Sequence, residues 1–226
     1  MATKQQVIDA KYDIVRAEQE QKLKEIFCPA ILAFAKENSF TTFEEIVAYT
    51  GEIDFSNYGI DSLKGIELIV GVTDLRLSNN PLLTKIDLTE NVNLTVLIAD
   101  NCSLTSVGSL SNKPDLTYIN LRNNSLVNLG TLNNSPLLTT IFLENNSINF
   151  IDSVSNLVSV SECRLSGNEL LTTQVDVLLS DFDTIKQNGG SISNLYLSGN
   201  SIPTDGALNT NFINLTNDGV VVTIDV

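Results

Sequence analysis

The segment Asp74–Asn80, which reads DLRLSNN, decides the fold because its pattern apolar-x-apolar-x-x-Asn returns along the chain. Further copies read VLIADN, INLRNN, IFLENN, CRLSGN and LYLSGN, and IDFSNYGI supplies an earlier one with Tyr58 in the place of the Asn. The residues that close the six segments are Asn80, Asn101, Asn124, Asn146, Asn168 and Asn200, which lie 21, 23, 22, 22 and 32 positions apart. A nearly constant period of this length indicates stacked units, and therefore an α/β solenoid.

The closing Asn of each segment has a structural explanation. The two apolar side chains are expected to point into the solenoid and the x residues outward from a strand. The chain then turns and leaves backbone N–H and C=O groups without strand partners, and an inward Asn can satisfy both. Loss of one Asn leaves buried amides unpaired, at roughly 1–3 kcal/mol each. These Asn are therefore predicted to be scaffold and not an active site.

The repeats resemble the leucine-rich-repeat family, and their period is similar to that of bacterial internalin-like proteins. The opening segment EIDFSNYGIDSLKGIELIVGVTDLRLSNN resembles the first coils of bacterial surface repeats, in which a small helical cap precedes the repeats. NPLLTKIDLTENVNLTVLIADN resembles Bacteroidetes-type repeats, in which a second short strand, here KIDLTEN, runs along the opposite side. The resemblance spans residues 43–200 and implies a right-handed coil with a concave parallel sheet. It also implies binding of proteins, glycans or lipids.

Residues 1–51 are expected to form a helical N-terminal segment and cap. Apolar residues recur near one helical face, although the polar run AEQEQK interrupts them: Ile8, Tyr12, Val15, Leu23, Ile26 and Phe27. Pro29 is expected to restart the helix, because proline removes a helical N–H donor. Thr42 and Glu45 have the spacing of a capping box, which predicts a short helix that stops by Gly51.

The repeat array is predicted over residues 52–200, in about seven coils, and a C-terminal cap over residues 201–226. The segment Thr173–Asn188 has apolar residues at helical spacing, so a convex helix explains the long last interval. Its Asp181 and Asp183 lack the further carboxylates of a calcium loop and are interpreted as a solvated helix face. In the cap, FINLT and VVVTIDV flank Asn-Asp-Gly at 217–219, which predicts a β-hairpin.

Binding residues are expected at the outward positions of the strands, which would line the concave face. The middle positions are predicted to be Asp54, Arg76, Leu97, Asn120, Phe142, Arg164 and Tyr196. Thr95 and Tyr118 are predicted in one flanking column, and Ala99 and Arg122 in the other. The candidate binding residues are Arg76, Leu97, Tyr118, Asn120, Arg122, Phe142, Arg164 and Tyr196. Arginine and aromatic residues together are typical of a protein-interface hot spot or a carbohydrate-stacking strip.

A second interpretation of the arginines stays open. Arg122 and Arg164 have Glu144 and Glu162 on neighbouring predicted strands, and opposite charges across strands stabilise a sheet. The arginines would then offset acids instead of binding a ligand. The two roles are compatible.

Composition disfavours several classes of protein. The net charge of −14 repels phosphate backbones, so nucleic acid is an unexpected partner. With no histidine, His-based triads and most zinc or iron centres are excluded, and neither a phosphate-binding loop nor a metal-spaced Cys pair occurs. No enzyme activity, cofactor or metal is therefore expected. Membrane insertion is not expected either, because no apolar run approaches the ~20 residues needed. The distant cysteines Cys28, Cys102 and Cys163 are interpreted as buried free thiols.

Two functional hypotheses follow. The first is a non-enzymatic recognition module whose concave sheet binds a protein or glycan. The alternative is a structural component of a larger assembly, such as a phage virion or a cell-surface array, attached through the N-terminal helix. Neither a signal peptide nor an anchoring tail is recognised, which favours a cytoplasmic or virion-associated location over secretion.

Overall fold

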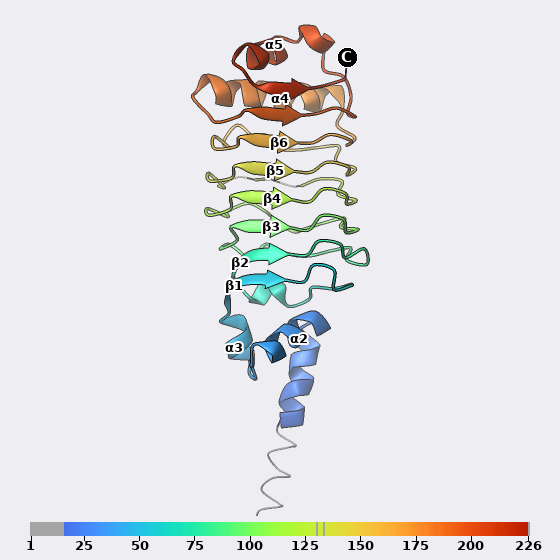
Figure 1. Cartoon of the computed structure of the whole chain (residues 1–226), viewed down its shortest axis with the longest axis vertical. Helices are drawn as coiled ribbons and strands as arrows, with labels where there is room; N and C mark the ends of the chain where they lie inside the picture. Colours follow the sequence, from blue (N-terminus) through green and yellow to red (C-terminus); the bar gives the residue numbers. More distant parts are fainter. Residues whose placement is uncertain (1–15, 130, 133, 226) are drawn as a thin grey trace, which may run out of the picture.

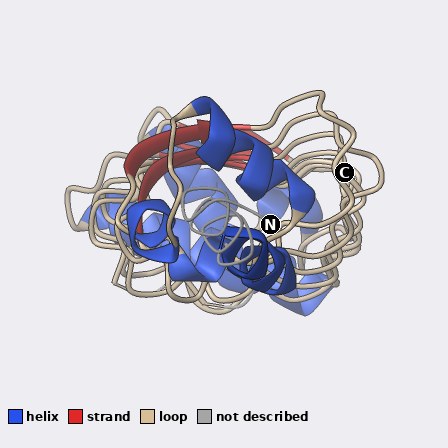
Figure 2. Cartoon of the chain, turned by 90° about the horizontal axis from the view of Figure 1, so that it is seen from below, coloured by secondary structure: helices blue, strands red, loops and turns tan. Residues whose placement is uncertain are grey.

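The chain forms a solenoid built on one parallel sheet, as the repeats predict (Figure 1). The computed structural model describes residues 16–129, 131–132 and 134–225. The strands stack in chain order: β1 (Thr50–Asp54), β2 (Gly71–Arg76), β3 (Val96–Ile98), β4 (Tyr118–Asn120), β5 (Thr140–Phe142), β6 (Glu162–Arg164), β7 (Asn194–Tyr196) and β8 (Val221–Thr223). Figure 2 shows that these strands make one curved wall of the coil and that loops and helices close the rest.

The core is a continuous column inside the coil. The central residue of each strand points inward and stacks on its counterpart in the next: Ile53, Leu75, Leu97, Ile119, Ile141, Cys163, Leu195 and Val222. All but Val222 are buried, as are the inward residues two positions later, such as Leu77 and Leu121. Each coil therefore covers the apolar interior of its neighbour, which stabilises a chain with no central globular core.

The structure corrects the predicted register of one repeat. Leu97 pairs with Leu75 and Ile119 in the sheet, so Leu97 faces the core. The closing side chains of the repeats stack in an inward ladder, and in this coil the residue at that position is Cys102, not Asn101. With Cys102 in the ladder, its members from Asn80 to Asn168 are each 22 positions apart. The prediction was wrong because it aligned this repeat on the nearest Asn instead of on its apolar pair.

The inward ladder makes the hydrogen bonds expected of a scaffold. Asn124 is typical: its Nδ2 donates to the carbonyl oxygens of Ala99 and Leu121 at 2.8 and 2.9 Å, and its Oδ1 accepts from the Leu104 amide at 2.9 Å. The same arrangement recurs at Asn80, Asn146, Asn168 and Asn200. The amide groups of these side chains therefore form hydrogen bonds with backbone groups that link neighbouring coils.

A second asparagine ladder, which the sequence reading missed, runs beside the first. Its members adopt a left-handed backbone with φ of 55–64°: Asn57, Asn79, Asn101, Asn123 and Asn145. Their side chains join neighbouring coils; Asn123 donates to Asn101 and Asn145 donates to Asn123, both at 2.8 Å. Glycines 167 and 199 continue the position with φ of 68° and 79°. Asn and Gly recur here because they tolerate this conformation best.

The N-terminal end of the column is closed by α2 (Pro29–Glu37) and α3 (Phe43–Val47). The predicted capping box is confirmed: Thr42 Oγ1 accepts from the Glu45 amide at 3.2 Å, and Glu45 Oε2 accepts from the Thr42 amide at 3.0 Å. Residues 16–26 form a further helix that is mostly exposed and projects away from the sheet (Figure 1). The predicted stripe residues Ile8, Tyr12 and Val15 lie outside the described residues.

The convex side carries the predicted long helix, α4 (Thr172–Gln187), and the short turn η1 (Ile66–Leu68). Asp183 is buried, contrary to the solvated face expected for it, and its Oδ2 accepts from Asn214 Nδ2 at 2.8 Å. Asp181 accepts from the Val154 amide at 2.8 Å. These aspartates join α4 to neighbouring segments. The predicted second strand KIDLTEN is reduced to one parallel bridge between Lys85 and Ser106.

The predicted C-terminal hairpin is wrong. FINLT lies in α5 (Thr210–Asn217), which follows the turn η2 (Gly206–Leu208), and β8 pairs in parallel with β7. The Asn-Asp-Gly sequence ends the helix: Gly219 has φ of 80°, and the Val220 amide donates to the Leu215 carbonyl at 2.9 Å. Glycine in a left-handed conformation is as typical of a helix end as of a hairpin turn, so the local signal was ambiguous.

Candidate binding face on the concave sheet

Three columns of side chains stand on the concave face, defined by the strand register. The first column is Glu52, Asp74, Val96, Tyr118, Thr140, Glu162, Asn194 and Val221. The middle column is Asp54, Arg76, Ile98, Asn120, Phe142, Arg164, Tyr196 and Thr223. The third column, two residues further along each repeat, is Ser56, Ser78, Asp100, Arg122, Glu144, Ser166 and Ser198.

The register of the third repeat changes three of the predicted positions. Ile98 takes the place expected for Leu97, Val96 that of Thr95, and Asp100 that of Ala99. Leu97 is fully buried and cannot contact a ligand. The signal that would have found the error is the constant spacing of 22 positions from Arg76 to Ile98 and Asn120.

Arg164 is the centre of a stacked cluster on β5, β6 and β7. Its guanidinium carbon lies 4.6 Å from the ring centroid of Phe142 on one side and 5.0 Å from that of Tyr196 on the other. Tyr118 meets Phe142 edge to face, with 5.7 Å between ring centroids. A cation over an aromatic face is stabilised by the ring quadrupole. The structure thus brings together four of the predicted binding residues: Tyr118, Phe142, Arg164 and Tyr196.

The same arginine is bound by two carboxylates. Arg164 Nη2 and Nε lie 2.5 and 2.7 Å from Glu162 Oε1, and Nη1 lies 3.7 Å from Glu144 Oε1. The hydrogen bond with Glu162 is the main cause that raises the pKa of the Arg164 guanidinium. Its two faces and its Nε–Nη2 edge are therefore in contact with groups of the protein, while the side chain stays 37% exposed. The predicted pairing across strands is present here alongside the aromatic cluster.

The other two arginines are also paired with acids of the face. Arg76 Nε lies 2.6 Å from Glu52 Oε1, and Arg122 Nε lies 4.0 Å from Asp100 Oδ2 rather than beside Glu144. Asp100 also accepts from Ser78 Oγ at 2.7 Å and from Asn120 Nδ2 at 3.3 Å. Asn120 is buried, so this predicted binding residue positions Asp100 instead of presenting a free amide.

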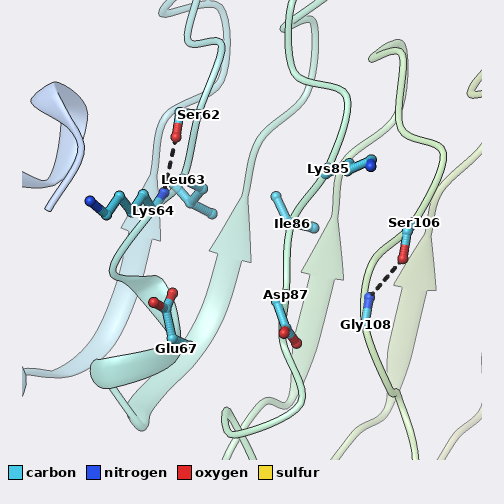
Figure 3. A pocket seen from close by; sticks show the side chains of 9 residues that line it. All are labelled: Ser62, Leu63, Lys64, Glu67, Lys85, Ile86, Asp87, Ser106 and Gly108. Carbon is cyan, nitrogen blue, oxygen red and sulfur yellow. Dashed lines mark hydrogen bonds between the residues drawn. The ribbon is translucent and has the colours of Figure 1, made fainter. Parts of the chain in front are cut away.

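A separate hollow lies among the loops on the other side of the coil (Figure 3). It has a volume of about 460 Å³ and is lined by Ser62, Leu63, Lys64, Glu67, Lys85, Ile86, Asp87, Ser106 and Gly108. Figure 3 shows that Lys64 and Lys85 extend away from each other. Lys64 Nζ donates to the Glu25 carbonyl. These charged groups do not converge on one point, so the hollow has no organised set of ligand-binding groups.

The structure shows no other chemistry-bearing cluster in the described part of the chain. Among residues 16–225 without 130 and 133, no three His, Cys, Asp or Glu side chains are arranged to hold a metal ion. In that same part, none of the helices is both long and apolar enough to cross a membrane. The cysteines are buried and free, as predicted, and burial raises the pKa of Cys163 to about 12. A thiol with such a pKa is a poor nucleophile near neutral pH.

No protein-family model matches the sequence, and no curated protein matches it. Among solved structures, the functional domain of InlJ from Listeria monocytogenes, which includes a cysteine ladder, is 22% identical with a TM-score of 0.50. The match covers 80% of this chain and 40% of that one, so the chain spans two fifths of its length. A leucine-rich-repeat protein of Leptospira interrogans is 15% identical with a TM-score of 0.37, covering 77% and 60% of the two chains.

Internalin C2 of Listeria monocytogenes is 16% identical with a TM-score of 0.32, covering 88% of this chain and 95% of that one. At these identities the comparisons concern the fold. The InlJ match, at a TM-score of 0.50, agrees with the parallel sheet and its ladders, which define a leucine-rich-repeat solenoid. More narrowly, the chain has an internalin-like leucine-rich-repeat fold, as the resemblance of its repeats predicts.

Proposed function

We propose that this protein is a non-enzymatic recognition module that binds a polypeptide partner on its concave sheet. The observation that carries the proposal is the cluster of Tyr118, Phe142, Arg164 and Tyr196 on neighbouring strands. Their side chains are held by one another and by Glu162, so little freedom is lost when a partner binds. Aromatic and arginine anchors of this kind are enriched in protein-binding hot spots, and solenoids use such extended concave surfaces for binding.

The geometry favours a polypeptide over a glycan at this cluster. A sugar ring stacks on an open aromatic face. One face of Phe142 is covered by Arg164, and Tyr118 also packs against the ring. The Nε–Nη2 edge of Arg164 is bound by Glu162, and Glu144 lies 3.7 Å from Nη1, so an acidic sugar would meet two carboxylates beside the guanidinium. The exposed ring edges and side-chain stems suit contact with the side chains of a protein.

The test is a screen of the full chain against protein-domain and glycan arrays. The double variant Phe142→Ala/Tyr196→Ala is expected to lose the protein signals obtained with the native chain. The matched control is Tyr58→Ala/Phe150→Ala, which removes one tyrosine and one phenylalanine that are exposed away from the concave columns. The proposal fails if the concave variant keeps every signal, or if all signals come from glycans. Circular dichroism of each variant checks that the fold persists.

A second candidate, attachment to a larger assembly, is supported by the helix at residues 16–26. This helix projects beyond the cap and is mostly exposed; Leu23 and Ile26 are partly buried. A groove of about 940 Å³ lies between it and the cap and is lined in part by Leu23, Leu32 and Phe40. An exposed helix beside a partly apolar groove suits helix-mediated association.

Light scattering of the full chain and of a chain that starts at Ile26 tests this candidate. The truncation must stop there because Phe27 is buried and packs on Phe43, with 5.9 Å between ring centroids. Association of the full chain and a monomeric truncated chain would support attachment through the helix. A monomer in both cases would count against self-association through it.

A further inference from the structure

We infer that β8 receives an extended, cationic segment of the polypeptide partner as an additional strand of the sheet. This inference rests on the proposed function and adds how the backbone of the partner is held. β8 is the last strand of the described sheet, so it has a neighbour, β7, on one side only. A strand in this position presents unpaired N–H and C=O groups with which an extended chain can pair.

The backbone groups of two residues in and next to β8 face away from β7. The Val221 amide donates to a carbonyl oxygen of the preceding coil, and the Thr223 carbonyl accepts from an amide of that coil, both at 2.8 Å. Val222 and Ile224 alternate with them and therefore direct one N–H and one C=O each towards the open edge. Among the described residues, the structure gives these outward groups no hydrogen-bond partner.

The opposite end of the sheet is closed. At β1, the outward carbonyl of Glu52 accepts from Tyr49 Oη at 2.7 Å, and the inward side chain of Ile53 is fully buried. The inward side chains of Val222 and Ile224 are only partly buried. The C-terminal end of the sheet therefore offers both backbone groups and apolar surface that an added strand would cover.

β8 also lacks the features that usually protect an edge strand. Residues 221–224 read VVTI, so all four are β-branched and none is charged or a proline. Natural edge strands are commonly protected by lysine, proline or a bulge, and β-branched residues favour strand pairing. Val221 is 52% exposed on the concave side. An added strand with apolar residues at alternate positions would cover Val222 and Ile224.

The charge at this end favours a cationic segment. No lysine or arginine follows Lys186 in the sequence, whereas Asp205, Asp218 and Asp225 do. Asp218 ends α5 just before β8, and Asp225 lies just beyond the strand, where its Oδ2 accepts from the Gly199 amide at 2.7 Å. A basic residue on the added strand meets complementary charge here. A second copy of this end would instead bring further acids.

The open edge continues the proposed concave face. Tyr196, which stacks on Arg164, pairs with Thr223 between β7 and β8. An added strand would therefore lie two strand intervals, or ~10 Å, from Tyr196. A partner whose side chains contact the Arg164 cluster is thus close enough to pair its backbone with β8.

Fluorescence anisotropy with the full chain tests the inference. The probe is a fluorescein-labelled peptide, Lys-Val-Thr-Val-Thr-Val-Lys. Two further versions carry N-methyl groups, one at both threonines and the other at the first two valines. Because alternate N–H groups of a strand face the same neighbour, one version is expected to bind at least tenfold more weakly and the other within threefold. Equal effects in both versions would overturn the inference, as would no binding of the unmodified probe at ~1 mM.

Val222→Pro tests the same edge from the side of the protein. Proline removes the outward N–H of this residue but no hydrogen bond with β7, and it is expected to weaken the probe at least tenfold. Val222→Ala keeps the N–H and is the matched control, with an expected change below threefold. Equal losses in both variants would overturn backbone pairing. Circular dichroism checks the fold; if Val222→Pro does not fold, the N-methylated peptides decide with the native chain.

Two further measurements test the nature of the partner. A peptide with Glu at each Lys is expected to bind at least tenfold more weakly than the probe, and equal or tighter binding would overturn the cationic character of the segment. Light scattering is expected to give the same mass for the native chain and for Val222→Pro. Self-association that Val222→Pro abolishes would assign the edge to a second copy and overturn the inference.

The two proposals fail separately. If array partners are lost in Phe142→Ala/Tyr196→Ala but bind Val222→Pro as tightly as the native chain, the recognition face stands and the edge inference falls. If array partners are lost only in Val222→Pro, the edge inference stands and the proposed role of the concave cluster falls.

Discussion

The Sγ atom of Cys102 lies 3.2 Å from the carbonyl oxygen of Leu77. In the neighbouring coils, the side-chain nitrogen of an Asn occupies the position that this sulfur takes here. Asn124 Nδ2 makes the equivalent contact with Ala99 at 2.8 Å, and its Oδ1 also accepts from a backbone amide. A thiol is a weak donor and a weak acceptor. This coil therefore has a weaker polar connection than the coils on either side.

Replacing this thiol by the ladder residue should stabilise the protein. Cys102→Asn is expected to raise the free energy of unfolding by about 1 kcal/mol, because one stronger donor and one acceptor are gained. Urea denaturation followed by circular dichroism measures the change. The reverse variant Asn124→Cys is the control and is expected to lower stability by roughly 1–3 kcal/mol. No gain in Cys102→Asn would mean that side-chain volume, and not hydrogen bonding, decides this position.

Two variants of Asn123, in the asparagine ladder with left-handed backbone, distinguish backbone strain from the loss of side-chain hydrogen bonds. Asn123→Ala places a Cβ-bearing residue without a polar group at φ 55° and removes the bonds to Asn101 and Asn145. We expect Asn123→Ala to be less stable than Asn123→Gly by about 1 kcal/mol, since glycine loses the same bonds but tolerates this φ. Thermal unfolding of both variants measures the difference. Equal stabilities would contradict a backbone requirement.

Lys113 should make alkaline stability depend on pH. It is fully buried, and its Nζ donates to the carbonyl oxygens of Leu88 and Asn91 at 2.7 and 3.1 Å. Desolvation lowers its pKa from the ordinary value of 10.5. Between the lowered folded pKa and 10.5, the unfolded chain binds more protons than the folded one. The contribution of Lys113 to stability therefore rises with pH across that window and is constant below it.

The measurement is urea denaturation at several pH values up to about 10.5 for the native chain and for Lys113→Met. The difference in stability between them should shift in favour of the native chain as pH rises through the window. Lys85→Met, at an exposed lysine, is the control and should show no such shift. A pH-independent difference for Lys113→Met would contradict the lowered pKa.

The cluster around Arg164 should contribute modestly to stability. Arg164→Met keeps an apolar stem between Phe142 and Tyr196 but leaves Glu144 and Glu162 without their cation. We expect a loss of about 1 kcal/mol, because the side chain is partly exposed and water screens the pairs. Adding Glu162→Gln should recover part of the loss, which a double-mutant cycle measures. Additive effects would show that the pair contributes nothing beyond its separate residues.

The sequence was sufficient to predict the solenoid, because its period and apolar spacing directly encode which residues stack. The capping box at Thr42 and the helix α4 were predictable for a similar reason, as each depends on neighbouring residues. The concave columns were predicted except in the third repeat, where two consecutive polar positions, Asp100 and Asn101, both fit the end of a strand. The strand register shows that Cys102 points inward, in agreement with the constant spacing of 22 positions.

Contacts distant in the sequence were beyond such reasoning. Asp183 looks like a surface residue of α4 until α5 packs beside it and Asn214 donates to it. Likewise, the Asn-Asp-Gly before β8 reads equally well as a hairpin turn or a helix end, and the parallel pairing with β7 decides between them. Position 164 was identified, but the placement of its guanidinium between two rings depends on side-chain conformation.

The helix α4 also has a consequence for the shape that a partner must have. A helix is ~10 Å wide, whereas adjacent strands are only ~4.8 Å apart, so a helical convex side takes more room than the sheet opposite it. The coils before α4 return through extended segments and turns, and the coils with α4 and α5 return through helices. We therefore expect the coils with α4 and α5 to be thicker on the convex side, which would tilt β7 and β8 towards the concave face. A straight, rigid partner that lies along β1 to β6 would then be blocked by the tilted strands at Tyr196 and Thr223, while a flexible one would follow the bend.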